Sequence, residues 1–444
     1  MTYFFCTDDD RRAMLASIGV DSVESLFASI PAEMRLARSL DLPPAAGELA
    51  LTQEMLELAG RNVPAGKRPC FLGAGAYDHF VPAVVDALAS RSEFYTSYTP
   101  YQPEVSQGNL QAMFEYQSLI CQLTGMDVSN ASLYDGGSAA AEAVLLCMSV
   151  TQRRRVVTAA SVHPEYRAII ETYFANLGAE LVTLATPGGR ISLDDLRAAV
   201  DGQTACVLVQ HPNFFGTLED MEAIVKIAHD AGALVAQSFD PISLGVLKRP
   251  GDLGVDVAIA EGQSLGTPLQ YGGAYLGIMA CREPFVRRLP GRIAGQTVDR
   301  HGKRCWVLTL QTREQHIRRE KATSNICTNQ GLFALRAAIY LAAMGPQGLR
   351  EAAELSVRKA AYAKRLLADH PRVGLKFADS TFKEFVVQDR FGKVEQLLQS
   401  AAQRGVLAGV PLRRWYPELA DCFLVAVTEK RTKAEIDAWA ASLH

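Results

Sequence analysis

The pattern of hydrophobic and polar residues predicts helices alternating with short buried strands from about residue 70 onward. Apolar residues recur at intervals of three and four over 110–121, which predicts a helix that ends at Gly125. The run Cys206-Val207-Leu208-Val209 is apolar on both faces, as in a parallel sheet covered by two helical layers. We expect strands at 131–134, 155–160, 180–185, 205–210, 233–239, 255–260 and 274–280. Helices are expected between most of them, for example at 139–150, 165–177 and 220–231.

The same pattern divides the chain into three regions. Residues 1–65 read as short helices joined by turns, too small and too polar on one side to fold alone, so we expect an arm lying against another surface. Residues 66–329 form the α/β region. Residues 330–444 read as a smaller α+β domain, with two long helices separated by Gly345-Pro346 and strands near 373–377, 384–388 and 422–427.

Composition narrows the possible partners. The 444 residues carry 45 Lys+Arg and 48 Asp+Glu, a formal charge of -3, so neither nucleic acid nor an anionic membrane is expected. The longest apolar run, 337–344, is far shorter than the roughly 18 residues of a membrane helix. The first residues place acids before bases and do not resemble a signal peptide. The nine cysteines form no CxxC pair, which favours reduced cytoplasmic thiols over a metal site.

Three polar positions follow successive predicted strands and could form one site. Gly136, Gly137 and Ser138 open a helix whose free N–H groups could bind an anion, or they form a plain turn. His163 could stack on a flat ring or simply begin a helix. Asp240 could pair with a protonated ring nitrogen or cap the next segment. Their order resembles the pyridoxal-phosphate (PLP) enzymes of the aspartate-aminotransferase-like fold, type I.

Such an enzyme needs a lysine one strand later, and this chain has none there. The run 261–268 reads Glu-Gly-Gln-Ser-Leu-Gly-Thr-Pro, and no lysine lies between Lys248 and Lys303. A glutamine amide cannot form an imine with PLP.

Long motifs make the resemblance more specific. The aromatic loop 95–108 (YTSYTPYQPEVSQG) is similar to a signature of the P-protein of the glycine cleavage system. Further similar runs lie at 71–78, 210–216, 261–268 and 318–330. The resemblance implies a PLP-transferase type I fold and, from the chain length, the two-subunit bacterial form.

The resemblance also implies that the two subunits have different roles. In that family subunit 2 carries the PLP lysine, and aligning the shared Thr267-Pro268 places Gln263 at the lysine position and Gly262 at the preceding histidine. We therefore expect no catalytic residue in this chain alone and PLP on the partner. The family reaction decarboxylates glycine and passes its aminomethyl group to lipoyl H-protein. The vestigial pocket would comprise Gly136, Gly137, Ser138, His163, Asp240 and Gln263.

Two segments are expected to reach the partner's site or the interface. Tyr95, Tyr98, Tyr101 and Gln102 belong to the aromatic loop, which could also be a rigid surface loop. Thr323, Asn325 and Thr328 follow a charged helical face, where this fold often presents a hydroxyl to a neighbour's cofactor phosphate.

Two alternatives remain open. The chain could be an autonomous PLP enzyme using another lysine, such as Lys248 or Lys321. It could also be a regulatory or binding subunit without a catalytic contribution.

Overall fold

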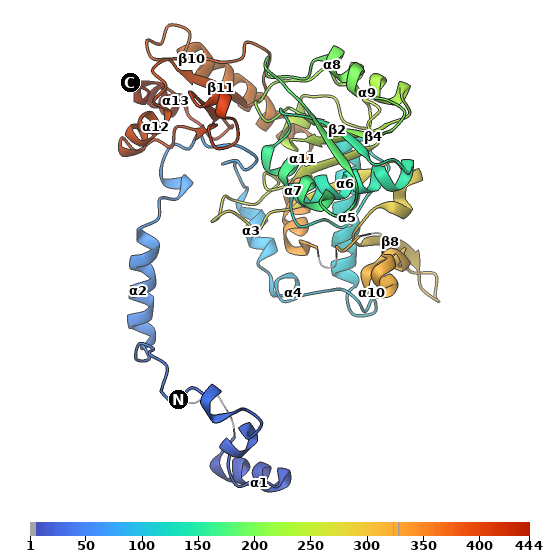
Figure 1. The fold of residues 1–444 in the computed structure, drawn as a ribbon, viewed down its shortest axis with the longest axis vertical. Helices are drawn as coiled ribbons and strands as arrows, with labels where there is room; N and C mark the ends of the chain where they lie inside the picture. The colour runs from blue at the N-terminus through green and yellow to red at the C-terminus, as the bar shows by residue number, and fades with distance from the viewer. Residues whose placement is uncertain (1–5, 323, 327–328) are drawn as a thin grey trace. The chain divides into compact units, whose positions relative to one another are not determined.

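The computed structural model describes residues 6–322, 324–326 and 329–444 (Figure 1). The chain divides into two compact units, Met1–Asn62 and Val63–His444. Both main sheets belong to the second unit.

A seven-stranded sheet forms the centre of the second unit, in the order β1-β7-β6-β5-β4-β2-β3. Strands β2 to β6 run parallel to their neighbours, whereas β7 is antiparallel to β6 and to β1. The bounds are β1 (Val128–Ser129), β2 (Arg155–Ala159), β3 (Glu180–Leu184), β4 (Thr204–His211), β5 (Leu234–Phe239), β6 (Val257–Glu261) and β7 (Gly277–Cys281).

Both faces of this sheet are buried, as the apolar runs predict. In β4, Val207 and Val209 pack into one hydrophobic core, and Cys206 and Leu208 pack into a second core on the other face. The first core receives α3 (Ala83–Ala89), α5 (Gln107–Thr124), α8 (Leu193–Ala199), α9 (Met221–Asp230) and the beginning of α11 (Gly331–Leu366). The second receives α6 (Gly136–Thr151) and α7 (Pro164–Phe174).

Local signals fix the ends of the helices that matter for the site. Gly125 caps α5 with a φ of 70°, a conformation that glycine adopts without strain. Asp135 caps α6, because its carboxylate accepts a hydrogen bond from the Ser138 N–H at 2.7 Å. The helix predicted at 139–150 therefore begins earlier, at the glycines.

A second, four-stranded antiparallel sheet lies near the C-terminus, in the order β10-β11-β13-β12. Its strands and helices are β10 (Val373–Leu375), β11 (Glu384–Asp389), α12 (Val394–Gln403), β12 (Val410–Pro411), β13 (Cys422–Ala426) and α13 (Lys433–Ser442). The fully buried Trp439 packs against Phe71 and Phe385 in the core of this small domain.

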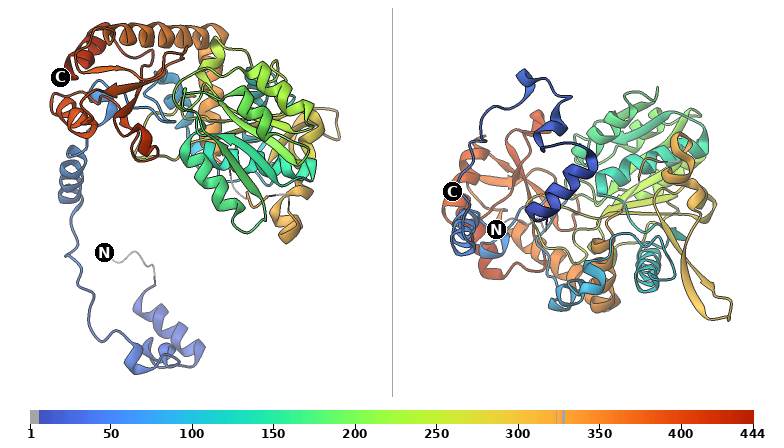
Figure 2. Two further views of the ribbon diagram at one scale, coloured as in Figure 1. Left: turned by 45° about the horizontal axis from the view of Figure 1, so that its top comes forward. Right: turned by 90° about the horizontal axis from the view of Figure 1, so that it is seen from below.

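The long helix α11 joins the two sheets (Figure 2, left). Gly345 has a φ of 61° and interrupts the helix before Pro346, which confirms the predicted break. By length and composition α11 could cross a membrane, but its buried face packs against α3 and α5, so we interpret it as a core helix. Buried residues of α11 belong to a core of the seven-stranded sheet and to the core of the four-stranded sheet, so the boundary at 329/330 stays a prediction.

Two features differ from the expectations. The predicted strand at 131–134 is wrong: Ser132 has a φ of 143°, and only Leu133 forms an isolated bridge, to Gly277. The hairpin of β8 (Ile293–Val298) and β9 (Arg304–Thr309) was not anticipated. The short helices α4 (Ser92–Tyr95) and α10 (Gln315–Arg318) complete the second unit.

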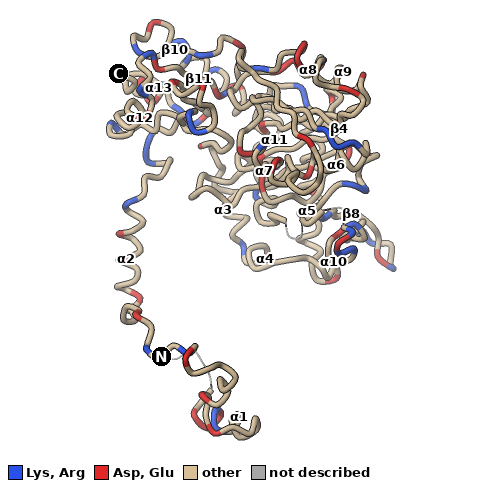
Figure 3. Tube along the Cα trace, in the orientation of Figure 1, with Lys and Arg blue, Asp and Glu red and all other residues tan. Residues whose placement is uncertain are grey.

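The N-terminal unit contains α1 (Asp8–Ile18) and α2 (Glu48–Gly60). None of its described residues, 6–62, is buried. Large apolar side chains are exposed along its length, including Met14, Ile18, Leu26, Phe27, Met34, Leu36, Leu40, Leu42, Leu49, Met55 and Leu56. Acidic and basic residues are interspersed along the described chain (Figure 3).

Candidate functional site

A cleft lies at the carboxyl ends of β4, β5 and β6, the edge where open α/β sheets place ligands. The structure brings His163 and Asp240 together there, as predicted from their positions after successive strands. The other wall is formed by Phe382, Lys383 and Glu384 of the small domain.

Asp240 is paired with a lysine of this same chain. Its Oδ2 lies 2.5 Å from Nζ of Lys383, whose side chain is 1% exposed. Its Oδ1 accepts a hydrogen bond from the Ile242 N–H at 2.9 Å. Both oxygens of Asp240 are therefore engaged.

The Lys383 ammonium has a partner for each of its three protons. Besides Asp240, Nζ lies 2.8 Å from Nε2 of His79 and 3.5 Å from the ring centre of Tyr77. His79 in turn contacts Glu429, with Nδ1 and Oε2 2.6 Å apart. Burial would raise the pKa of Glu429, but its contacts with His79 and with the Phe80 N–H lower it to about 2.

The glycines that open α6 are also engaged from within the chain. The Gly136 N–H donates to Oε2 of Glu261 at 2.9 Å. Oε1 of Glu261 accepts from the N–H groups of Gln263 and Leu276 at 3.0 and 2.9 Å. Burial raises the pKa of Glu261 to about 7, and these three donors oppose the rise. A carboxylate therefore lies at the N–H group expected to bind an anion.

His163 is stacked on an aromatic ring of its own helix. The ring centres of His163 and Tyr166 lie 4.5 Å apart with an interplanar angle of 18°. Nε2 of His163 contacts the Ala74 carbonyl at 3.0 Å, and Nδ1 accepts from the Glu165 N–H at 3.2 Å. Tyr166 also reaches Gly136, where a Cβ would lie 2.2 Å from its hydroxyl. Gly137 is equally covered, by Ile169.

Gln263, the residue aligned with the family lysine, points at the backbone of Tyr77. Its Oε1 accepts from the Tyr77 N–H at 2.9 Å, and its Nε2 donates to the carbonyls of Tyr77 and Thr267 at 3.1 and 2.7 Å. The side chain is 1% exposed and has a structural role. The neighbouring Ser264, also without an amine, faces the cleft.

The cleft does not fit PLP. About 40 Å³ of free space remains in it, whereas small-molecule pockets usually measure roughly 300–1,000 Å³. Each feature expected to bind the cofactor already has an internal partner: Asp240 has Lys383, the glycine loop has Glu261, and His163 has Tyr166.

A second hollow lies between the aromatic loop and residues 329–335, and Tyr101, Gln102 and Asn325 are not among the residues that line it. The aromatic loop and the beginning of α11 enclose about 230 Å³, lined by Tyr95, Tyr98, Asn329 and Gln330 among others. Tyr95 and Tyr98 are 67% and 84% exposed. Gln102 and Asn325 are also exposed, and Thr323 and Thr328 lie outside the described residues.

A buried arginine supports the aromatic loop. Arg292 is 2% exposed and donates from Nη2 to the Tyr101 hydroxyl at 2.9 Å, and its guanidinium stacks over the Tyr101 ring. No carboxylate in the described parts of the chain forms an ion pair with it. Its Nη1 also donates to Oδ1 of Asn329 at 3.4 Å, so the buried cation connects the aromatic loop with a residue that lines the hollow.

Sequence reasoning did not identify Lys383, Glu261, Tyr166 or Arg292. Only Glu261 and Tyr166 carried a local signal, because each lies close to a residue already singled out. Lys383 and Arg292 are distant in sequence from the groups that they contact.

Comparisons with known proteins agree with this architecture. The family model for the glycine cleavage system P-protein matches residues 1–443. The chain is 51% identical over 437 residues to the probable glycine dehydrogenase (decarboxylating) subunit 1 of Desulforamulus reducens, covering 98% of each. A crystal structure of glycine decarboxylase (P-protein) in an inhibitor-bound form is similar with a TM-score of 0.92 at 45% identity, covering 100% of this chain and 99% of that one. A C-DES mutant with glycine covalently linked to its PLP cofactor has a TM-score of 0.64 at 14% identity over 85% of this chain and 97% of that one, and shares the fold alone.

Proposed function

The chain belongs to the glycine cleavage system P-protein family, and from this premise we propose that it is the subunit without a cofactor lysine in a two-subunit glycine dehydrogenase (decarboxylating). The observation that supports this role is Gln263, whose amide is held by backbone groups at the position aligned with the family lysine. An amide supplies no nucleophilic amine at any pH.

We place PLP on the partner, subunit 2, where it would supply the electron sink for glycine decarboxylation. The aminomethyl group would then pass to lipoyl H-protein. This chain would contribute the hollow between the aromatic loop and the start of α11, which Tyr95 and Tyr98 line. The exposed Tyr101, Gln102 and Asn325 would also face the partner's site or the interface. The free cysteines among the described residues fit a reducing compartment, and we propose the cytoplasm.

The chain alone should form no stoichiometric imine with PLP. Among the described residues that line the cleft, the lysine is Lys383, and its Nζ is buried between Asp240, His79 and the Tyr77 ring, so an aldehyde has no free path to it. Borohydride reduction in the presence of PLP, followed by peptide mass analysis, should show no pyridoxyl group on Lys383, Lys248 or Lys321. Gln263→Lys should not restore activity, because the new side chain would lose three backbone partners and meet a filled cleft.

This measurement also decides between the proposal and an autonomous enzyme. A stoichiometric adduct on any lysine of the isolated chain, with glycine decarboxylation in the absence of subunit 2, would establish the autonomous alternative. Lys248, exposed and paired with Glu222, serves as the reference for nonspecific labelling.

Removal of residues 2–62 should weaken association with subunit 2. This unit buries none of its described residues and exposes a long series of apolar side chains, so it needs a covering surface. Obligate interfaces bury upwards of about 2,000 Å². We expect the dissociation constant, measured by analytical ultracentrifugation of the mixed subunits, to rise at least about 100-fold.

A matched change tests whether hydrophobic contact is responsible. Replacement of Leu49 and Leu56 of α2 by Ser, both strongly exposed (74% and 68%), should reproduce part of the loss. The same replacement of Thr52 and Glu57, also exposed on α2, should not. Unchanged association after removal of the whole unit would contradict the role of the arm.

A further inference from the structure

We propose that this chain carries an internal substitute for PLP: three of its own side chains occupy the three positions where the ring, the ring nitrogen and the phosphate would bind. Tyr166 stacks on His163, Lys383 forms an ion pair with Asp240, and Glu261 accepts a hydrogen bond from Gly136 at the N-terminus of α6. This inference concerns the chain's own cleft and is independent of which residues complete the partner's site.

The charges of the three groups match those of the cofactor. PLP would bring a cationic ring nitrogen to Asp240, and Lys383 places an ammonium there at 2.5 Å. The phosphate would bring negative charge to the N–H groups that open α6, and the carboxyl group of Glu261 accepts from one of them at 2.9 Å. Each of these two positions therefore already has an internal partner.

Tyr166 lies between His163 and the turn at Gly136. Its ring lies nearly parallel to His163, as a pyridine ring would, and its hydroxyl end covers the backbone of Gly136. Since Gly136 has no Cβ, the phenol can approach this closely. One planar side chain therefore spans the distance from the stacking His to the anion-binding turn.

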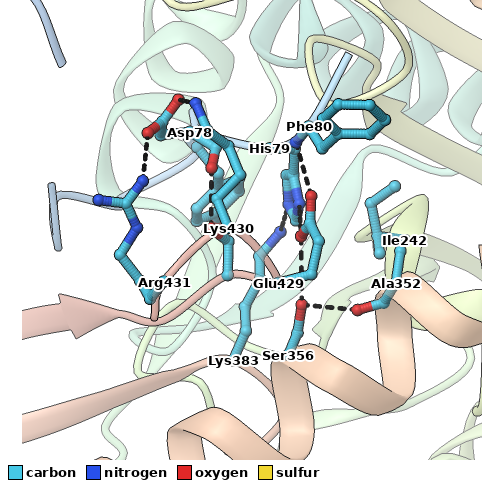
Figure 4. Close-up of polar contacts among 12 residues, drawn as sticks. Asp78, His79, Phe80, Ile242, Ala352, Ser356, Lys383, Glu429, Lys430 and Arg431 are labelled. Atoms are coloured by element: carbon cyan, nitrogen blue, oxygen red, sulfur yellow. Dashed lines mark hydrogen bonds and ion pairs between the residues drawn. The ribbon is translucent and has the colours of Figure 1, made fainter. Parts of the chain in front are cut away.

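Lys383 also holds the small domain against the large one. Figure 4 shows its ammonium directed at His79, whose other ring nitrogen meets Glu429. Beside them Asp78 pairs with Lys430 and Arg431 at 2.6 and 2.7 Å. Asp240 follows β5, whereas Lys383 precedes β11 and residues 429–431 follow β13, so these contacts connect the two sheets. Lys383, as part of the internal substitute, therefore holds the two sides of the cleft together.

Amine labelling of the assembled two-subunit enzyme tests the closure without any substitution. Lys383 should react with acetic anhydride at least 100-fold more slowly than the exposed Lys248, as measured by quantitative peptide mass analysis. Lys364 is half-buried and donates to the Thr381 hydroxyl at 2.8 Å; it should show an intermediate rate and is the matched control. Labelling of Lys383 at the rate of Lys364 would overturn the proposal.

Binding of pyridoxine 5′-phosphate tests the substitution itself. This probe has the ring nitrogen and phosphate of PLP but no aldehyde, so it cannot form imines with surface lysines. Borohydride first fixes the partner's PLP. In equilibrium dialysis with about 1 mM pyridoxine 5′-phosphate, which would detect a dissociation constant of that order, the wild-type pair should bind no further equivalent of the probe. The variant Tyr166→Ala, Glu261→Ala, Lys383→Ala should gain one equivalent.

The control variant removes the same residue types from sites outside the cleft: Glu171→Ala, Tyr173→Ala, Lys364→Ala. It should bind as little as the wild type. An extra equivalent bound by the wild-type pair would overturn the proposal, as would a folded, associated triple cleft variant that binds none. If the triple cleft variant fails to fold, the proposal is still tested by probe binding to the wild-type pair and by the labelling rate of Lys383. Neither result depends on partner activity, so the proposed function is tested separately.

Discussion

Lys383→Met is expected to destabilise the folded chain by about 3–5 kcal/mol, the usual effect of removing one member of a buried ion pair. The ammonium is 1% exposed and lies between Asp240, His79 and the Tyr77 ring. Its loss leaves the Asp240 carboxylate in a cleft with no other cation in contact among the described residues. Urea unfolding of the assembled enzyme, followed by fluorescence, measures the change in unfolding free energy.

The double variant Lys383→Met, Asp240→Asn separates the ion pair from simple packing. Each single variant leaves one buried charge of the pair without its partner, whereas the double variant leaves neither. The double variant should therefore lose less stability than the sum of the single variants, by roughly 1–3 kcal/mol. The amide introduced by Asp240→Asn would keep an acceptor for the Ile242 N–H. Lys364→Met is the control: it removes one hydrogen bond to Thr381 and should cost about 1 kcal/mol. Additive effects of the two cleft substitutions would show that Lys383 and Asp240 act independently.

The sequence predicted the large sheet because its strands carry their own signal. The run 206–209 is apolar on both faces, and β4 is buried on both faces between two helical layers. The break at Gly345 was equally local, since glycine followed by proline disfavours a continuous helix. The strand expected at 131–134 failed because apolar composition does not report backbone conformation at Ser132.

The site was predictable only where chain order places groups on one sheet edge. His163 and Asp240 both follow parallel strands, so their proximity follows from topology. Lys383 enters from the small domain, and no spacing rule connects it with Asp240. Glu261 was read as part of a family motif, and its role depends on three backbone N–H groups that only the folded chain brings together.

Tyr98→Phe is expected to lower glycine turnover by the assembled enzyme by about 10- to 100-fold while subunit association is unchanged. Tyr98 is 84% exposed, and its hydroxyl makes no hydrogen bond to the described parts of the chain. A hydroxyl that serves a partner's charged group contributes roughly 1.5–3 kcal/mol, which corresponds to this range. Steady-state assays with lipoyl H-protein measure the rate, and sedimentation measures association.

Tyr173→Phe is the matched control, because Tyr173 is a partly exposed tyrosine on α7 and belongs to neither of the two segments tested. Asn325→Ala and Thr328→Ala extend the test to the domain junction, where the same range is expected. A purely structural or regulatory subunit would tolerate all three site substitutions within about twofold, since a lost hydrogen bond to solvent costs almost nothing. A loss confined to turnover would instead require that side chains of this chain contact the reacting groups, because each substitution removes a polar atom and leaves the buried core of the fold intact.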